Sequence, residues 1–202
     1  MTIPILVATR NRHKVRELRR LLAGLPVRLL LLDQFPAIPP IAETGRTFRK
    51  NAVKKALNVS RRTILLVLAE DSGLEVKALD GRPGVRSARF AGSSQNDSAN
   101  NKKLLRAMEQ IPASKRRAHY VCCLALAAGG RLIRTFQAEC AGSIAVAPAG
   151  RGGFGYDPLF IPLGDRRTMA QLGPRVKNGV SHRAKAVGAF RRWLSGQLKK
   201  AA

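Results

Sequence analysis

The chain has 202 residues, with 37 lysines and arginines against 12 acidic residues and a formal net charge of +25 at pH 7. This length buries a core without help from a disulfide or zinc, and three cysteines, two of them adjacent, give neither a disulfide framework nor a metal-ligand spacing. No run approaches the roughly 18 apolar residues of a membrane span, and the N-terminus lacks the features of a signal peptide. We therefore expect a cytoplasmic protein with no membrane contact.

Apolar runs and helically spaced apolar residues alternate along the chain and predict both strands and helices. Helix-linked and hairpin-linked strands together favour an α/β fold, with a central mixed β-sheet and flanking helices in a single domain at 1–202. The predicted elements, in chain order, are a strand at 3–8, a helix beginning at Asn11, a strand at 27–32, a helix beginning at Thr44 or Thr47, strands at 63–69 and 74–78, a helix capped by Asp97, a hairpin of strands at 119–128 and 131–139, a strand at 142–146, a glycine-rich loop at 150–158 and a helix capped by Ser181.

Two adjacent acids, Glu70 and Asp71, follow the apolar run 64–68 in a chain that is poor in acids. Adjacent side chains of a regular strand point to opposite faces, so both acids enter one site only if the strand ends there. The following Ser-Gly favours such an end. An aspartate at this place would hold Mg²⁺ or activate a water. The competing interpretation is a turn-forming aspartate that bonds its own backbone.

The segment 8–14, Ala-Thr-Arg-Asn-Arg-His-Lys, lies at a predicted strand-to-helix junction, where free backbone N–H groups and the helix dipole favour an anion. Thr9 and Asn11 add neutral donors, and Lys14 adds a point charge. An ordinary capped turn with solvated basic residues explains the same pattern. In the next predicted helix, Lys55 lies one turn from Asn51 on the same face, where a solvated helix face is the simpler interpretation.

Two later segments carry further ligand-binding chemistry. Glycines in the segment 152–158 let the backbone approach a ligand closely, and Phe154 offers a flat face for a base, which favours a ligand loop over a plain surface turn. Lys177 and the Ser-His-Arg run at 181–183 offer several donors to a keto oxygen or a phosphate, although a lone histidine is more often structural.

Together these segments resemble the non-canonical purine NTP pyrophosphatases, also called inosine or xanthosine triphosphate pyrophosphatases. The matching runs keep the family's order and span nearly the whole chain, and the Phe-Gly-Tyr-Asp-Pro and Ser-His-Arg signatures are highly specific as a pair. The runs are Ala8-Thr9 with Asn11 and Lys14; Glu43-Thr44-Gly45 with Thr47-Phe48, Asn51-Ala52 and Lys55-Ala56; Asp71-Ser72-Gly73-Leu74-Glu75-Val76; Gly84 with Ser87-Ala88-Arg89; Gly152 to Pro158; and Ser181-His182-Arg183.

The resemblance implies an elongated sheet, two lobes around a nucleotide cleft, and a homodimer. It also implies Mg²⁺-dependent hydrolysis of ITP, dITP and XTP to the monophosphate and pyrophosphate, with Asp71 as catalytic base and Asp71 and Glu70 as metal ligands. The implied substrate-binding residues are the phosphate motif Thr9, Arg10, Asn11, Arg12, His13 and Lys14; the lysines Lys55 and Lys177; Ser72, Phe154, Gly155, Tyr156 and Asp157 around the nucleoside; and His182 and Arg183 at the purine's 6-keto edge.

Three positions depart from the family's usual pattern. Arg10 stands where glycine is common, and Gln171 where an acid is common. Ala42 replaces an acid that helps to bind metal, and we expect Glu43 beside it to point the other way in an extended chain. These losses predict weaker metal binding.

The net charge supports a second hypothesis, a basic nucleic-acid-binding protein on the same scaffold with weak or lost catalysis. However, the charges are spread along the chain and aromatic residues make up only 5% of it, whereas single-strand binders interleave stacking aromatics with basic residues. A third hypothesis is a related pyrophosphatase that acts on modified pyrimidines.

Overall fold

The computed structural model describes residues 2–92 and 95–201, so residues 1, 93–94 and 202 of the predicted domain lie outside the described part. The chain divides into two compact units, each with its own apolar core. Unit 1 comprises Met1–Asp71, Cys122–Ala138 and Arg183–Ala202, and unit 2 comprises Ser72–Val121 and Glu139–His182.

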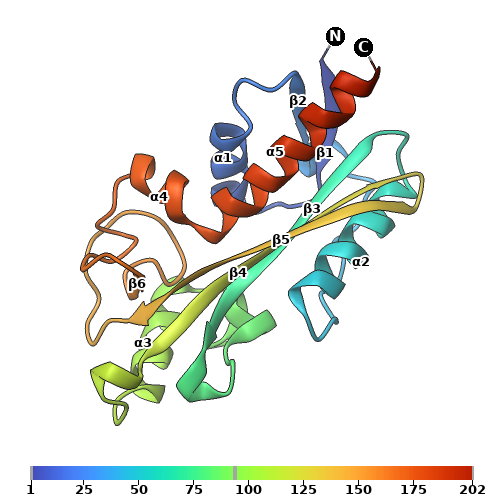
Figure 1. Cartoon of the computed structure of the whole chain (residues 1–202). Helices are drawn as coiled ribbons and strands as arrows, with labels where there is room; N and C mark the ends of the chain where they lie inside the picture. The colour runs from blue at the N-terminus through green and yellow to red at the C-terminus, as the bar shows by residue number, and fades with distance from the viewer. Residues whose placement is uncertain (1, 93–94, 202) are drawn as a thin grey trace. The chain divides into compact units, whose positions relative to one another are not determined.

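The helices and strands follow one another along the chain largely in the order that the sequence predicts (Figure 1). One helix, α4, is additional to the prediction, and it begins at a proline that is suited to a first helical turn. In chain order the elements are β1 (Ile3–Val7), α1 (Arg12–Leu21), β2 (Val27–Leu31), α2 (Phe48–Ser60), β3 (Leu66–Val76), α3 (Asp97–Ala107), β4 (Arg117–Ala128), β5 (Arg131–Ile144), β6 (Phe160–Pro162), α4 (Pro174–Val180) and α5 (His182–Ala201).

The strands of the described residues form one mixed sheet in the order β2-β1-β3-β4-β5-β6. Strand β1 runs parallel to both β2 and β3, with Ile5 opposite Leu29 on one side and Leu66 on the other. Strands β5 and β6 are antiparallel, and β4 and β5 are neighbours joined by the predicted Gly-Gly turn. The prediction of an α/β fold with a mixed sheet and flanking helices is confirmed.

Three local predictions are wrong. The strands predicted at 63–69 and 74–78 are one strand, β3, because paired neighbours on an inner strand keep an Asp-Ser-Gly sequence extended. The strand predicted at 142–146 is the end of β5, where residues 142–144 pair with β6. Helix α3 is capped by Asn96, whose Oδ1 accepts the Ala99 N–H at 3.0 Å, and Asp97 is its first residue.

In unit 1, α1 and α5 lie on one face of the sheet and α2 lies on the other (Figure 1). Alternation along β3 sends Leu68 to the α1 and α5 side, where it packs with Leu18 and Phe190. The apolar face predicted for α2 is buried as expected, at Phe48, Ala52, Ala56 and Val59.

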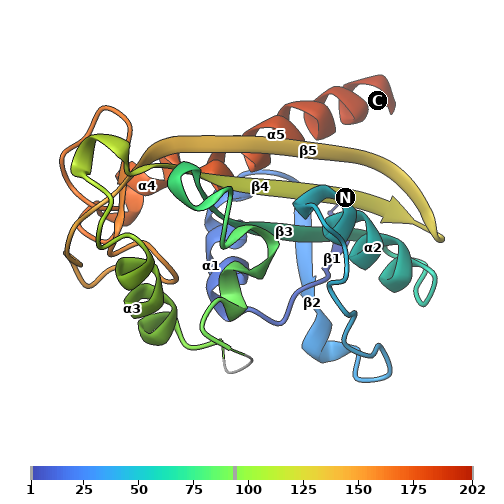
Figure 2. The same ribbon diagram turned by 90° about the horizontal axis from the view of Figure 1, so that it is seen from below.

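Unit 2 has its core where α3 covers its segments of β3, β4 and β5 (Figure 2). Leu104 of α3 and Met108, the residue directly after this helix, pack there with Leu74 and Tyr120. Ser181 is extended between α4 and α5, so the last helix begins directly after it, as predicted.

The three cysteines are buried free thiols, as predicted. Burial raises the pKa of Cys123 to about 11, so this thiol is protonated at neutral pH. Among the helices that the structure describes, none combines the length and the apolar character of a membrane span.

Candidate active site

The adjacent acids Glu70 and Asp71 are both buried on β3, with 1% and 5% of their surface exposed. The sequence predicts that the strand ends at the acidic pair, but β3 continues through Asp71 to Val76. The two side chains therefore leave the strand on opposite faces. Glu70 meets cations from α1 and α5, whereas Asp71 meets a lysine from α2.

The carboxylate of Glu70 is held by two cations. Arg183, at the start of α5, donates from Nε at 2.9 Å and from Nη2 at 2.7 Å to its two oxygens, and Lys14 Nζ lies 3.3 Å from Oε1. Arg183 also donates to Glu17 of α1 at 2.5 Å. Burial by itself would lower the pKa of Arg183, but the charges of Glu70 and Glu17 outweigh it and raise that pKa. This ion network joins α1, β3 and α5 and fixes Lys14.

Asp71 has one oxygen near a cation and one without a donor. Its Oδ1 lies 3.5 Å from Lys55 Nζ, while its Oδ2 is buried and accepts no hydrogen bond from the described residues. Burial raises the pKa of Asp71 above its usual 3.8, and Lys55 and Lys14 oppose that rise. The amide of Asn51 also lowers this pKa, although its Nδ2 makes no hydrogen bond of normal geometry. A buried oxygen in this state calls for an added ligand.

Lys55 of α2 brings a second carboxylate to this place. Its Nζ donates to Glu43 Oε1 at 2.7 Å, to the carbonyl of Glu70 at 2.6 Å and to Asp71 Oδ1 at 3.5 Å. Glu43 therefore reaches the same ammonium group as Asp71, and the prediction that it points away is wrong. Its proximity also raises the pKa of Asp71.

The loop before α2 explains the position of Glu43. Thr47 caps α2 by accepting the Lys50 N–H at 3.1 Å, and the Gly45 N–H donates to Asn51 Oδ1 at 2.7 Å. A Cβ on Gly45 would lie 2.7 Å from that same oxygen. Glycine thus lets the loop fold back onto the first turn of α2, which carries Glu43 toward β3.

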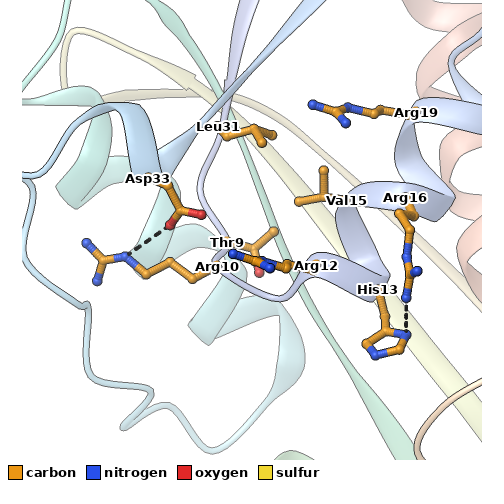
Figure 3. A pocket seen from close by; sticks show the side chains of 9 residues that line it. All are labelled: Thr9, Arg10, Arg12, His13, Val15, Arg16, Arg19, Leu31 and Asp33. Carbon is orange, nitrogen blue, oxygen red and sulfur yellow. Dashed lines mark hydrogen bonds and ion pairs between the residues drawn. The ribbon is translucent and has the colours of Figure 1, made fainter.

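The side chains of the segment predicted to bind phosphate lie in two different places around the start of α1. Asn11 caps the helix as predicted, with Oδ1 accepting the N–H groups of His13 at 2.9 Å and Lys14 at 3.1 Å. Lys14 points to β3. Arg10, Arg12 and His13 instead line, together with Thr9, a separate pocket of about 460 Å³ (Figure 3).

In unit 2, the glycine-rich loop is held by a buried ion pair. Asp157 Oδ2 accepts from Lys177 Nζ at 2.6 Å and from the Phe154 N–H at 2.9 Å. Lys177 Nζ also lies 4.9 Å from the centre of the Phe154 ring. Gly153 has a φ of +77°, and a Cβ there would collide with the Asp157 carboxylate. Lys177, which the resemblance assigns to phosphate, is therefore engaged with this loop.

The other loop residues are anchored within unit 2. The buried Tyr156 donates its hydroxyl to the Ser87 carbonyl at 2.8 Å, so it belongs to the core of this unit. Gly155 is held by α3, since its N–H donates to Asp97 at 2.7 Å and its carbonyl accepts from Asn101 at 2.9 Å. Sequence reasoning missed both α3 side chains because more than fifty residues separate them from the loop. Ser72 is half-buried on β3.

His182 closes unit 2 and is followed by Arg183, the first residue of the last segment of unit 1. The His182 ring is buried and stacks on Tyr120, with ring centroids 4.6 Å apart and 7° between the planes. Sequence reasoning missed Tyr120, and it missed Glu17, the second partner of Arg183. Neither has a motif around it that signals a contact so distant along the chain.

Comparison with known proteins shows the family of the chain. Residues 5–193 match the Ham1 family.

The chain belongs to the Ham1 family.

A relative named dITP/XTP pyrophosphatase, from Geobacter sulfurreducens, is 47% identical over 193 residues, which cover 96% of this chain and 97% of the relative. One of the same name from Geobacillus kaustophilus is 51% identical over 183 residues, which cover 91% and 90%. Among solved structures, the Ham1 protein of Staphylococcus aureus has a TM-score of 0.86 at 34% identity, and the match covers 96% of this chain and 99% of that one. A HAM1 protein from Coxiella burnetii has a TM-score of 0.87 at 36% identity, with coverage of 96% and 100%.

Across the described part of this Ham1 chain, no group of three or more His, Cys, Asp or Glu side chains is placed to hold a metal ion. Two carboxylates, Glu43 and Asp71, share one lysine. Ala42 contributes no third acid. Any metal held here would take its remaining ligands from water and substrate.

Proposed function

We propose that this chain hydrolyses purine nucleoside triphosphates with a 6-keto base, namely ITP, dITP and XTP, to the monophosphate and pyrophosphate. Membership of the Ham1 family supports this function, as do relatives named dITP/XTP pyrophosphatase that match nearly the whole chain. The observation that carries it is the buried Asp71 oxygen without a donor, on a carboxylate beside a lysine. The comparisons favour this enzyme over the nucleic-acid-binding alternative.

The residues around Asp71 fit a divalent metal ion, and we propose Mg²⁺. Asp71 and Glu43 would hold it, because Mg²⁺ takes one or two carboxylates and fills its other positions with waters and substrate phosphate oxygens. When bound, the ion would shield phosphate charge and lower the pKa of a bound water. We leave Glu70 out of the metal site, since Arg183 and Lys14 occupy its oxygens.

The chemistry at the α–β phosphoanhydride requires an oriented water and neutralised charge more than covalent help. We assign Asp71 the role of orienting and deprotonating the water, since burial raises its pKa toward the range of a general base. Lys55 places its positive charge beside both Asp71 and Glu43. Lys14 offers its charge to the phosphates, and we assign Glu70 and Arg183 the role of positioning it.

We propose that His182 recognises the purine base at its 6-keto edge. The ring of His182 is oriented by its stack on Tyr120. A donor to the 6-keto oxygen would oppose the 6-amino group of adenine donor to donor, and such a mismatch leaves buried polar groups unpaired. GTP shares the 6-keto group, so GTP has to be excluded through its 2-amino group. The loop held by Asp157 and Lys177 is proposed to line the nucleoside side.

Pyrophosphate release from a panel of triphosphates, with and without Mg²⁺, tests the function. We expect ITP, dITP and XTP to give monophosphate and pyrophosphate, ATP and GTP to react far more slowly, and chelation to stop the reaction. Absence of release from all three keto substrates would overturn the proposal, and release from modified pyrimidines alone would favour the third hypothesis. The homodimer stays a prediction of the family resemblance, and the cytoplasmic location stays a prediction from the sequence.

A further inference from the structure

The pocket beside α1 is unusually rich in arginine. Four arginines line it, Arg10, Arg12, Arg16 and Arg19, against one carboxylate, Asp33 (Figure 3). Asp33 lies 3.8 Å from Arg10, which also donates to the Ile38 carbonyl at 3.0 Å. One carboxylate thus leaves most of the positive charge of the pocket unbalanced.

Two of these arginines have no partner among the described residues. Arg16 Nη2 lies 2.9 Å from His13 Nδ1, but the side chains of Arg12 and Arg19 make no hydrogen bond or ion pair with the described residues. Both extend from α1 toward the segment that carries Leu31 and Asp33 (Figure 3). Two guanidinium groups that face one pocket repel each other unless an anion lies between them.

This pocket is distinct from the site at Asp71. Residues advance by about 100° around a helix, so Arg12 and Lys14 are roughly 160° to 200° apart on α1. Lys14 faces β3, where it meets Glu70, and Arg12 and Arg19, two turns apart, face the β2 side. An anion held by the arginines is therefore not the anion held by Lys14.

We propose that this pocket is a second anion site, which binds a free oligophosphate, that is, two or more linked phosphate groups. Guanidinium groups match phosphate oxygens in a two-pronged geometry, and Arg12 and Arg19 are about 10 Å apart along the helix axis, which suits linked phosphates better than one. No Phe, Tyr or Trp lines the pocket in the described structure, so a nucleic-acid base would find no stacking partner.

The test is a calorimetric titration of the full chain with inorganic tripolyphosphate, in chelator and at physiological salt. We expect wild type to bind one more tripolyphosphate per chain than the double variant Arg12→Gln/Arg19→Gln. Arg19→Gln alone should lower the affinity of this additional site about tenfold, the loss expected for one hydrogen bond to a charged group. The matched control is Arg20→Gln, since Arg20 is exposed on the same helix but outside the pocket.

Three results would overturn the proposal. The first is an equal number of sites in wild type and the double variant. The second is an equal loss in Arg20→Gln, which would indicate a general charge effect. The third is displacement of the anion from the arginine-dependent site by a short oligonucleotide at equal phosphate concentration, which would assign the pocket to nucleic acid. Folding of each variant is checked by its thermal transition. Because no triphosphate is hydrolysed here, the outcome is separate from that of the proposed function.

Discussion

Two neighbouring carboxylates on one strand, Glu70 and Asp71, differ in how far their oxygens are paired. Glu70 is enclosed by an arginine and a lysine, and both its oxygens are engaged. Asp71, one residue later, keeps a buried oxygen without a donor and has a raised pKa. A satisfied buried carboxylate serves stability, whereas an unsatisfied one costs stability and is retained for chemistry. Substitution of each should therefore affect different properties.

The largest effect is expected from Asp71→Asn on catalysis. The amide keeps the shape of the side chain but can neither take a proton nor hold a metal as a carboxylate does, so we expect the rate of pyrophosphate release to fall by roughly 10²- to 10⁴-fold. Steady-state kinetics with ITP measures this. The control is Glu109→Gln, the same acid-to-amide change at an exposed position, which should retain full activity. An active Asp71→Asn enzyme would remove the basis of the comparison.

Glu70→Gln should have the largest effect on stability. It leaves the buried Arg183 without its main counter-charge, and breaking a buried pair in this way costs about 3–5 kcal/mol. Asp71→Asn should change the free energy of unfolding by about 1 kcal/mol or less, because that oxygen has no donor to lose. Urea unfolding of both variants compares them directly. The reverse order of the two stabilities would contradict our assignment.

Asp157→Asn extends the comparison to unit 2, since Asp157 is another satisfied buried carboxylate. Its loss of charge leaves the buried Lys177 ammonium without its partner, and we expect a cost of about 2–3 kcal/mol. The same urea experiment measures it. Unfolding at the wild-type denaturant midpoint would show that the ion pair contributes nothing to this loop.

The smallest effect is a pH dependence of stability in the metal-free protein. Because the pKa of Asp71 is raised above its usual 3.8, the native state holds this proton more tightly than the unfolded chain. Wild-type stability should therefore decline as pH rises from about 4 through the raised pKa, by about 1.4 kcal/mol for each unit of the shift. Asp71→Asn lacks this decline, so its stability relative to wild type should increase with pH. A difference that stays constant between acidic and neutral pH would count against the raised pKa.

Much of the local structure is readable from short sequence signals. Asn11 caps the helix that the sequence predicts for it, and Thr47 is the one of the two predicted starts that caps α2. The apolar face of α2 is the one that its spacing indicates. The presence of both helix-linked and hairpin-linked strands predicts the mixed sheet that the structure contains. These features depend on neighbours within one or two turns, where a side chain and the backbone group it bonds are close in sequence.

Sequence motifs also indicated the family and singled out Asp71 as the candidate catalytic residue, because residue types in a fixed order carry that information. Only the tertiary structure decided that β3 continues through the acidic pair, that Glu43 reaches the lysine beside Asp71, and that Arg183 pairs with Glu70 across more than a hundred residues. Strand pairing and burial are properties of distant segments brought together. Opposite faces of one strand, which a sequence lists as neighbours, become separate environments only when helices cover them.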